Sequence, residues 1–293
     1  MSRFVLGAAL ALSVSASGLS MQEPDGPSFS EVQLSDQLVF LRANTNISNP
    51  STLIYRDEAF TLVVDPGLAP TQHLLADYVD GAAPVYSVTT HGHRDHAEAT
   101  TALRASRTVI APAFLLEEEE AAEGVVHLTL HGELRLESAT GDVLIGQLPA
   151  SNGHTGGDLW IWFEDANVLA VGDYYFLRRY PIIDVDWGGS VEGYFRNIEW
   201  MLERFPADAT MVPGHSSFGP APAETASMED WRNWMDDVRA SMQTIRDWSA
   251  EGLSRDEIVE RGLPERFAYL TERPAFRNEE RWIDFVLETA SEG

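Results

Sequence analysis

The feature that most constrains the fold is a series of short apolar segments that each end in a turn carrying histidine or aspartate. The segment at residues 85–88 runs directly into TTHGHRDHAEAT, where four potential metal ligands fall within six residues. Later apolar segments run into SNGHTGGD, VGDYYF and MVPGHSS. Short apolar runs bounded by Gly and Pro turns are typical of strands. Because α/β proteins place their sites at the carboxyl ends of strands, the pattern predicts an α/β fold with its site there.

The order of apolar patterns predicts two rounds of strands followed by helices. Strands are expected at residues 32–42, 52–56, 60–64, 85–88, 108–111, 125–130, 133–137, 143–148, 159–163, 168–171 and 210–212, and helices at 71–79, 97–104, 113–122, 190–205 and from 228 onward. We interpret the acidic run at residues 117–120 as a solvated helix face. This order favours an internally duplicated sandwich of two sheets flanked by helices.

Composition limits the chemistry of any site. The 293 residues suffice for one large domain or two small ones, and they contain no cysteine. Disulfides, zinc–thiolate sites, iron–sulfur clusters and thiol nucleophiles are therefore excluded, so a metal must bind histidine and carboxylate groups. The formal net charge is -26, and all 20 basic residues are arginine. Such a chain repels nucleic acid, so the expected partner is a small-molecule substrate.

The first residues predict export. Arg3 is followed by an apolar run and then by small residues, which is typical of a secretory signal peptide at residues 1–20, with cleavage near Ala16. The apolar run is short for a bilayer span, and no later stretch is a transmembrane candidate, so no stable membrane insertion is expected after cleavage. Residues 21–30 are interpreted as a linker, and the mature protein as periplasmic or secreted.

The histidine cluster by itself allows three interpretations, namely a catalytic metal site, a histidine-rich loop without function, or a structural zinc site. Its ligand types recur at other strand ends, where glycines allow close backbone approach. Five of the eight histidines lie in such turns: His91, His93, His96, His154 and His215. The other three, His73, His127 and His131, are interpreted as ordinary surface or half-buried residues.

These pieces together resemble the metallo-β-lactamase superfamily. The HxHxDH signature stands at residues 91–96, followed in order by Gly153-His154-Thr155, Gly172-Asp173 and Pro213-Gly214-His215. The turn Asp65-Pro66-Gly67 also matches an aspartate turn of the family. The resemblance implies a four-layered αββα sandwich over residues 31–220. A helical C-terminal extension at residues 221–293 would pack on it.

The resemblance also implies a ligand set. His91, His93 and His154 would hold a first metal ion, Asp95, His96 and His215 a second, and Asp173 would bridge them. Seven ligands exceed the four of a structural zinc site. Two Zn²⁺ ions are expected, although iron or manganese fits the same donors. Asp65 either supports a ligand histidine or is simply a turn aspartate.

The implied function is hydrolysis. Two metal ions about 3.5–4 Å apart can share a hydroxide, which would attack an ester, lactone, thioester or amide of a small molecule. Asp173 would fix the spacing of the ions, and Asp95 would help to orient the nucleophile. The ligand set is closer to glyoxalase II and lactonases than to β-lactamases. A periplasmic β-lactamase, and a non-catalytic metal-binding accessory protein of a periplasmic redox system, are the alternatives.

Residues 174–190 suggest a substrate loop beside the metals. We expect its aromatic residues and its arginine pair either to contact substrate or to pack within the protein: Tyr174, Tyr175, Tyr180, Trp187, Arg178 and Arg179. Residues 43–49 would form a second wall. Arg94 is expected to point away from the ions towards a carboxylate, and Trp231, Trp234 and Trp248 are expected in the core.

Overall fold

The computed structural model describes residues 26–45, 48–79, 83–100, 106–112, 126–216, 221–271 and 277–290. The predicted signal peptide, the predicted helix at residues 113–122 and its acidic run lie outside these residues. No helix in the described ranges is long and apolar enough to cross a membrane.

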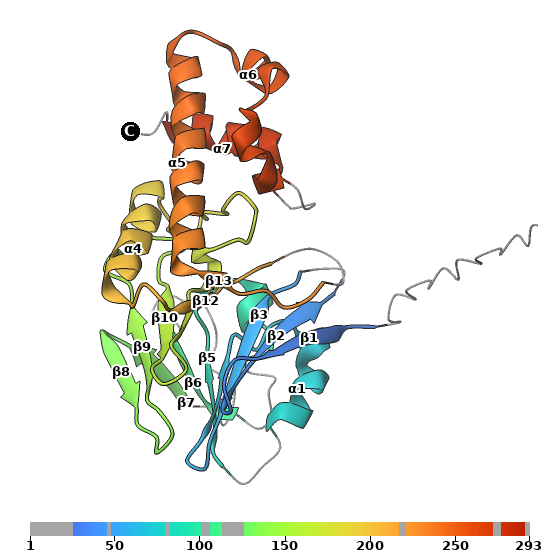
Figure 1. Cartoon of the computed structure of the whole chain (residues 1–293), viewed down its shortest axis with the longest axis vertical. Coiled ribbons are helices and arrows are strands. Elements are labelled where there is room, and N and C mark those ends of the chain that lie inside the picture. Colours follow the sequence, from blue (N-terminus) through green and yellow to red (C-terminus); the bar gives the residue numbers. More distant parts are fainter. Residues whose placement is uncertain are drawn as a thin grey trace, which may run out of the picture.

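Two sheets form the centre of the molecule (Figure 1). The first has the order β1 to β7, with β1–β4 antiparallel and β4–β7 parallel. Its strands are β1 (Ser28–Gln33), β2 (Leu38–Asn44), β3 (Ser51–Arg56), β4 (Thr61–Val64), β5 (Val85–Val88), β6 (Ser106–Pro112) and β7 (Val126–Leu130).

The second sheet has the order β13-β12-β11-β10-β9-β8, and only β11 and β12 run parallel. Its strands are β8 (Glu133–Leu136), β9 (Val143–Gln147), β10 (Leu159–Phe163), β11 (Val168–Ala170), β12 (Thr210–Val212) and β13 (Ala226–Ser227). The parallel pairs matter for function, because their carboxyl ends point to the same edge of each sheet.

The sheets pack face to face, as the alternation of side chains along β10 shows. Leu159, Ile161 and Phe163 point into the core between the sheets, while Trp160 and Trp162 point to the outer face. Helix α4 (Val191–Arg204) covers that outer face, and α1 (Gln72–Val79) covers the outer face of the first sheet. The layers are therefore helix, sheet, sheet and helix, which confirms the expected αββα sandwich.

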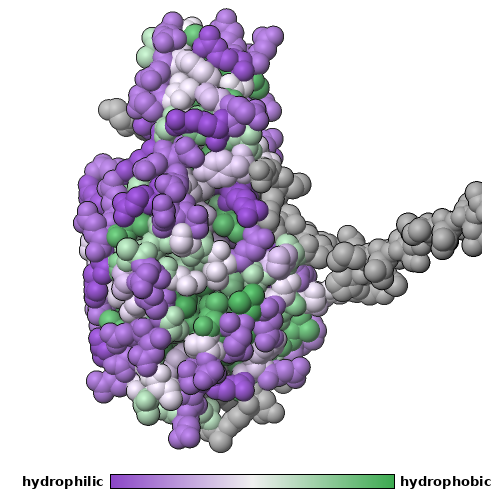
Figure 2. All heavy atoms as spheres, in the orientation of Figure 1, coloured by the Kyte–Doolittle hydropathy of each residue, from purple (hydrophilic) through white to green (hydrophobic). Residues whose placement is uncertain are grey.

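A helical extension follows the sandwich. Helix α5 (Met228–Ala250) rises from it and carries α6 (Arg255–Arg261), the 3₁₀ helix η3 (Glu265–Thr271) and α7 (Glu279–Ala290) (Figure 1). Ser227 and Asp230 form a capping box at the start of α5. In the view of Figure 2 the surface of the extension is mostly hydrophilic. Its core is aromatic instead, with Trp231, Trp234 and Trp282 at most 2% exposed.

Three sequence predictions need correction. The run at residues 32–42 is not one strand, because Leu34 and Ser35 donate their N–H groups back to the carbonyl of Leu38 and form a turn between β1 and β2. Strand β1 begins at Ser28, inside the segment interpreted as a linker. In the described part of the helix expected at residues 97–104, only Ala97 is helical, as the last residue of α2 (Arg94–Ala97), so Asp95 and His96 lie in the first turn of α2. Residues 101–104 lie outside the described residues.

Candidate metal centre

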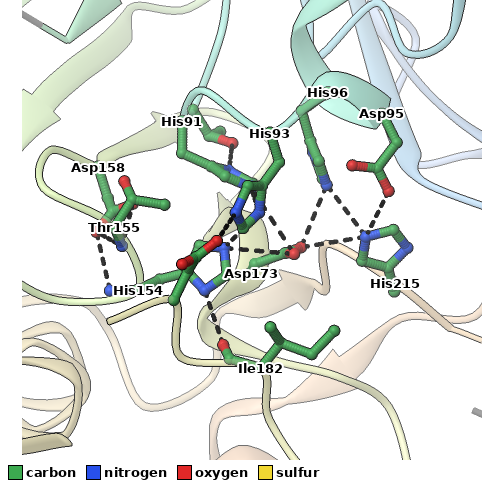
Figure 3. A network of polar contacts seen from close by, with 12 residues as sticks. His91, His93, Asp95, His96, His154, Thr155, Asp158, Asp173, Ile182 and His215 are labelled. Carbon is green, nitrogen blue, oxygen red and sulfur yellow. Dashed lines mark hydrogen bonds and ion pairs between the residues drawn. The ribbon is translucent and has the colours of Figure 1, made fainter. Parts of the chain in front are cut away.

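Seven side chains meet where the carboxyl ends of strands from both sheets come together (Figure 3). Strand β5 leads into the turn with His91 and His93 and then into α2 with Asp95 and His96. His154 lies between β9 and β10. Asp173 lies in the 3₁₀ helix η2 (Gly172–Tyr174) after β11, and His215 follows β12. A methyl group on Gly214 would overlap the carboxylate of Asp173. Glycine is thus required where the β12 turn passes the centre.

The first group of candidate ligands consists of His91, His93, His154 and Asp173. Nδ1 of His93 lies 3.1 Å from Nε2 of His91 and 3.0 Å from Nε2 of His154. His91 and His154 are at most 1% exposed, whereas the side chain of His93 is 21% exposed. Three ring nitrogens therefore face one point, and solvent reaches that point past His93.

The second group consists of Asp95, His96 and His215. Nε2 of His215 lies 3.1 Å from Nε2 of His96 and 3.3 Å from Oδ2 of Asp95. His96 is fully buried, whereas the side chain of Asp95 is 22% exposed. The centre is thus closed on most sides and open past His93 and Asp95.

Asp173 lies between the two groups and faces both. Its Oδ2 is 3.7 Å from Nε2 of His91 and 3.6 Å from Nε2 of His154. Its Oδ1 is 3.3 Å from Nε2 of His96 and 3.4 Å from Nε2 of His215. One carboxylate oxygen is therefore available to each group.

Four of the five histidines donate a hydrogen bond from the nitrogen that faces away from the centre. The acceptors are Thr90 Oγ1 for His91 (2.9 Å), Asp184 Oδ2 for His93 (2.9 Å), Asp65 Oδ2 for His96 (2.8 Å) and the carbonyl of Ile182 for His154 (2.8 Å). These bonds fix the tautomers, so the inward nitrogens of the neutral rings carry lone pairs.

Lone pairs about 3 Å apart repel unless a cation lies among them. Nitrogens that share one tetrahedral Zn²⁺ at 2.0–2.1 Å are roughly 3.3 Å apart, close to the 3.0–3.1 Å separations found here. Oδ1 of Asp173 is also buried without a hydrogen bond. The donor set and this buried oxygen both fit metal ions, and the residues present can hold one ion in each group.

The electrostatics of the two groups differ. Burial lowers the pKa of His154 to about 4 and, with His96 and His154 nearby, lowers that of His91 well below its usual value. Burial also opposes the charging of His215, but Asp173 and Asp95 raise its pKa to about 9. The first group therefore offers neutral imidazoles, and the second attracts a positive charge.

Comparison with known proteins identifies the family. The model of the metallo-β-lactamase superfamily matches residues 46–240. The chain belongs to this superfamily of metal-dependent hydrolases. A search of curated proteins finds no match.

Solved metallo-β-lactamases share the fold at low sequence identity. The enzyme from Pontibacter korlensis has a TM-score of 0.58 at 15% identity, covering 72% of this chain and 99% of its own. The enzyme from Hirschia baltica has a TM-score of 0.55 at 17% identity, covering 72% and 97%. The DIM-1 metallo-β-lactamase has a TM-score of 0.57 at 16% identity, covering 73% and 98%.

In this superfamily member, Asp65 joins the two parts of the HxHxDH turn. It follows β4 with a φ of +48° and accepts hydrogen bonds from the N–H and hydroxyl of Thr90, both at 2.7 Å, as well as from His96. The hydroxyl of Thr90 in turn accepts from His91. Asp65 therefore orients one histidine of each group, a larger role than the turn position alone indicates.

Asp158, which the sequence did not single out, holds the turn that carries His154. Its carboxylate accepts from the N–H groups of His154 and Thr155 and from the hydroxyls of Thr155 (2.8 Å) and Tyr174 (2.8 Å). Burial raises the pKa of Asp158 to about 6 although these donors lower it. Tyr174 is 1% exposed and also accepts from Asn197. Tyr174 is therefore a support of the His154 turn and does not line a substrate pocket.

Residues 174–189, the loop after Asp173, connect the centre to the helical extension. The indoles of Trp231 and Trp234 donate to the carbonyls of Tyr174 (3.0 Å) and Arg179 (2.8 Å). Tyr180 stacks on Trp282 at 4.9 Å. The same loop then supplies the acceptors for His93 and His154 described above. Contacts thus run from α5 and α7 to the ligands of the first group.

Only part of the predicted substrate loop faces the centre. Trp187 is 38% exposed and its ring lies 5.7 Å from that of His93. Tyr175 and Tyr180 are buried, at 3% and 1% exposure. Arg179 is also buried, and its Nε donates to the carbonyl of Ser216. Because the tryptophans of the extension pull this loop inward, Tyr175, Tyr180 and Arg179 pack within the protein.

Arg178 turns away from the centre. It is exposed, has a φ of +57° and lines a separate cavity. Arg94 also points away, as expected, and pairs with Glu98 through its Nε at 2.9 Å. From the other side, Ser48 donates to Oδ2 of Asp95 at 2.6 Å. The described part of the second predicted wall therefore does reach the candidate ligands.

Proposed function

We propose that this hydrolase is a binuclear zinc enzyme that cleaves an ester, lactone, thioester or amide bond of a small molecule. The observation that carries the proposal is the position of Asp173, whose two oxygens face different groups of histidines. A structural site needs no such shared carboxylate. Iron or manganese is compatible with the same nitrogen and oxygen donors.

The residues of the centre would have different roles in the reaction. Bound metal ions would supply water with a pKa of about 7 and would polarise a substrate carbonyl. Asp173 would set the spacing of two bound ions, because it offers one oxygen to each group. Nearby His96 and His215 keep the pKa of Asp95 low against the effect of burial, so this carboxylate stays ionised. It reaches the open side, where it can accept a hydrogen bond from an attacking water.

The open side also indicates how substrate enters. His93 and Asp95 are partly exposed at the centre, Trp187 beside them is exposed, and the exposed Val185 lies two residues before Trp187. An apolar part of a substrate would pack on Trp187 while its carbonyl reaches the two groups. The charge of -26 disfavours nucleic acid and other polyanions.

Metal analysis and a substrate panel test the proposal. The purified chain is expected to hold about two metal ions and to hydrolyse at least one of a set of lactones, thioesters, aryl esters and β-lactams. Asp173→Asn should lower turnover by roughly 100-fold or more and reduce metal content. Asp208→Asn, an exposed position, serves as the control. A fully metal-loaded protein that hydrolyses nothing on the panel would instead support an accessory metal-binding role.

Efficient hydrolysis of nitrocefin would favour the alternative, a periplasmic β-lactamase, which the likeness to solved metallo-β-lactamases supports. We also propose that residues 1–20 are removed on export to the periplasm or medium. Determination of the N-terminal residue of the protein recovered from the periplasm of an expressing bacterium tests this. An intact Met1 would contradict it.

A further inference from the structure

A second cavity lies where the helical extension joins the sandwich. Its volume is about 610 Å³, within the range of small-molecule sites. Its lining comes from residues 175–178, from residues 224–226 at β13, from α5 and from η3. None of the seven candidate metal ligands lines it. The cavity is therefore distinct from the candidate metal centre.

Aromatic side chains form one wall of this cavity. Tyr175 and Trp234 pack edge to face at 5.1 Å, and Tyr269 lies beside them. Tyr175 is 3% exposed, yet its hydroxyl makes no hydrogen bond with the described residues. The hydroxyl is not fully buried, and Tyr175 lines the cavity, so the hydroxyl opens into it. A buried tyrosine with a free hydroxyl at a cavity wall points to a ligand.

The cavity carries an excess of negative charge. Glu224, Asp230 and Asp237 line it, and Arg178 is the one basic residue among the described residues of the lining. These residues carry three negative charges and one positive charge, a net charge of -2. Asp230 accepts from the neutral hydroxyl of Ser227, and Asp237 accepts from the hydroxyl of Tyr269 at 3.0 Å. The pairing of Asp237 with the exposed Arg266 is long, at 3.8 Å. Asp230 and Asp237 therefore keep most of their attraction for a cation.

We propose that this cavity binds a small organic cation such as an alkylammonium compound. Carboxylates together with aromatic rings are the combination that recognises such cations. The cavity acids are not among the groups of side chains that converge closely enough to hold a metal ion, and three carboxylates disfavour an anion. The overall charge of -26 raises the local concentration of cations further.

Calorimetric titration with choline and with its neutral isostere 3,3-dimethyl-1-butanol tests the proposal on the full chain. Choline is expected to bind with one site per chain, and the isostere at least about fivefold more weakly. Asp237→Asn should weaken choline binding by about fivefold, the upper range for a partly exposed ion pair. Arg178→Gln should strengthen it, because a like charge is removed.

The matched control is Asp236→Asn, which removes the same charge from the neighbouring, exposed position of α5 outside the cavity lining. Equal binding of choline and the isostere would overturn the proposal. So would equal weakening by Asp236→Asn and Asp237→Asn, since binding would then follow the overall charge and not this cavity. Thermal melting of each variant checks that the fold is retained.

Discussion

Replacement of Asp65 by asparagine should disrupt the second group of ligands without changing the shape of the side chain. Oδ2 of Asp65 accepts two hydrogen bonds, from the hydroxyl of Thr90 at 2.7 Å and from Nδ1 of His96 at 2.8 Å, while Oδ1 accepts from the N–H of Thr90 at 2.7 Å. An amide has only one oxygen. Whichever way it turns, its NH₂ group faces at least one donor of Thr90 or His96.

The size of the effect follows from this count. A buried donor that faces another donor and lacks an acceptor lowers the stability of the site by about 1–3 kcal/mol. If His96 changes tautomer to avoid it, Nε2 becomes protonated and no longer offers a lone pair to a metal ion. We therefore expect metal affinity at the second group to fall between about fivefold and about 100-fold. The first group should change less, because His91 contacts Asp65 only through Thr90.

Competition with a chromophoric chelator measures the two affinities separately. Asp77→Asn, on the exposed side of α1, is the control for loss of one negative charge. If Asp65→Asn binds two ions as tightly as the parent chain, the carboxylate does not set the tautomer of His96 and the reasoning is wrong. Turnover should fall with occupancy of the second group, and added metal should partly restore it.

Two further variants test the helical extension. Trp231→Phe removes the donor to the carbonyl of Tyr174 and should lower the free energy of unfolding by about 1–3 kcal/mol, as seen by urea denaturation, whereas Trp248→Phe should change it less. The hydrogen bond from Ser227 lowers the pKa of Asp230 in the folded chain. The ionised carboxylate of Asp230 therefore stabilises α5 at neutral pH. This stabilisation is lost as the pH falls below about 4, the unfolded value, and through the lower folded pKa. Asp230→Asn should therefore be less stable than the parent by about 0.3–1 kcal/mol at pH 7, and the difference should shrink in acid. A difference that does not depend on pH would exclude this charge effect.

The sequence predicted best what depends on local pattern. The strand ends that bring His91, Asp173 and His215 together are set by short apolar runs and glycine turns, and the structure confirms those strands. The role of Asp184 could not be read in the same way, because it acts on His93, 91 residues earlier in the chain. Asp158 acts on the neighbouring His154 and Thr155, but the pattern of apolar runs does not show which way its side chain turns. Their only signal is a carboxylate close in sequence to a candidate site segment.

The predicted substrate loop shows most clearly what could not be predicted from the sequence. Tyr175 and Arg179 are polar residues next to a candidate ligand, and in isolation they suit a binding wall. Trp234, in a helix more than 50 residues later, turns them into the interior, because its indole donates to the carbonyl of Arg179 and its ring packs edge to face on Tyr175. Trp234 and Arg179 are 55 residues apart in the chain. Residue type was therefore a poor guide, since tertiary contacts decided the direction of each side chain.

The bonds from Trp231 and Trp234 to the loop after Asp173 also bear on how the protein is made. A nascent chain that has just passed His215 already carries all seven candidate ligands. The helices α5 and α7, which contact the loop at Tyr174, Arg179 and Tyr180, have not yet been synthesised. If the centre binds metal ions as proposed, we expect tight binding at the first group to require folded α5 and α7. Metal loading would thereby discriminate between complete and truncated chains, because a chain that ends early keeps its ligands but lacks the support that orients them.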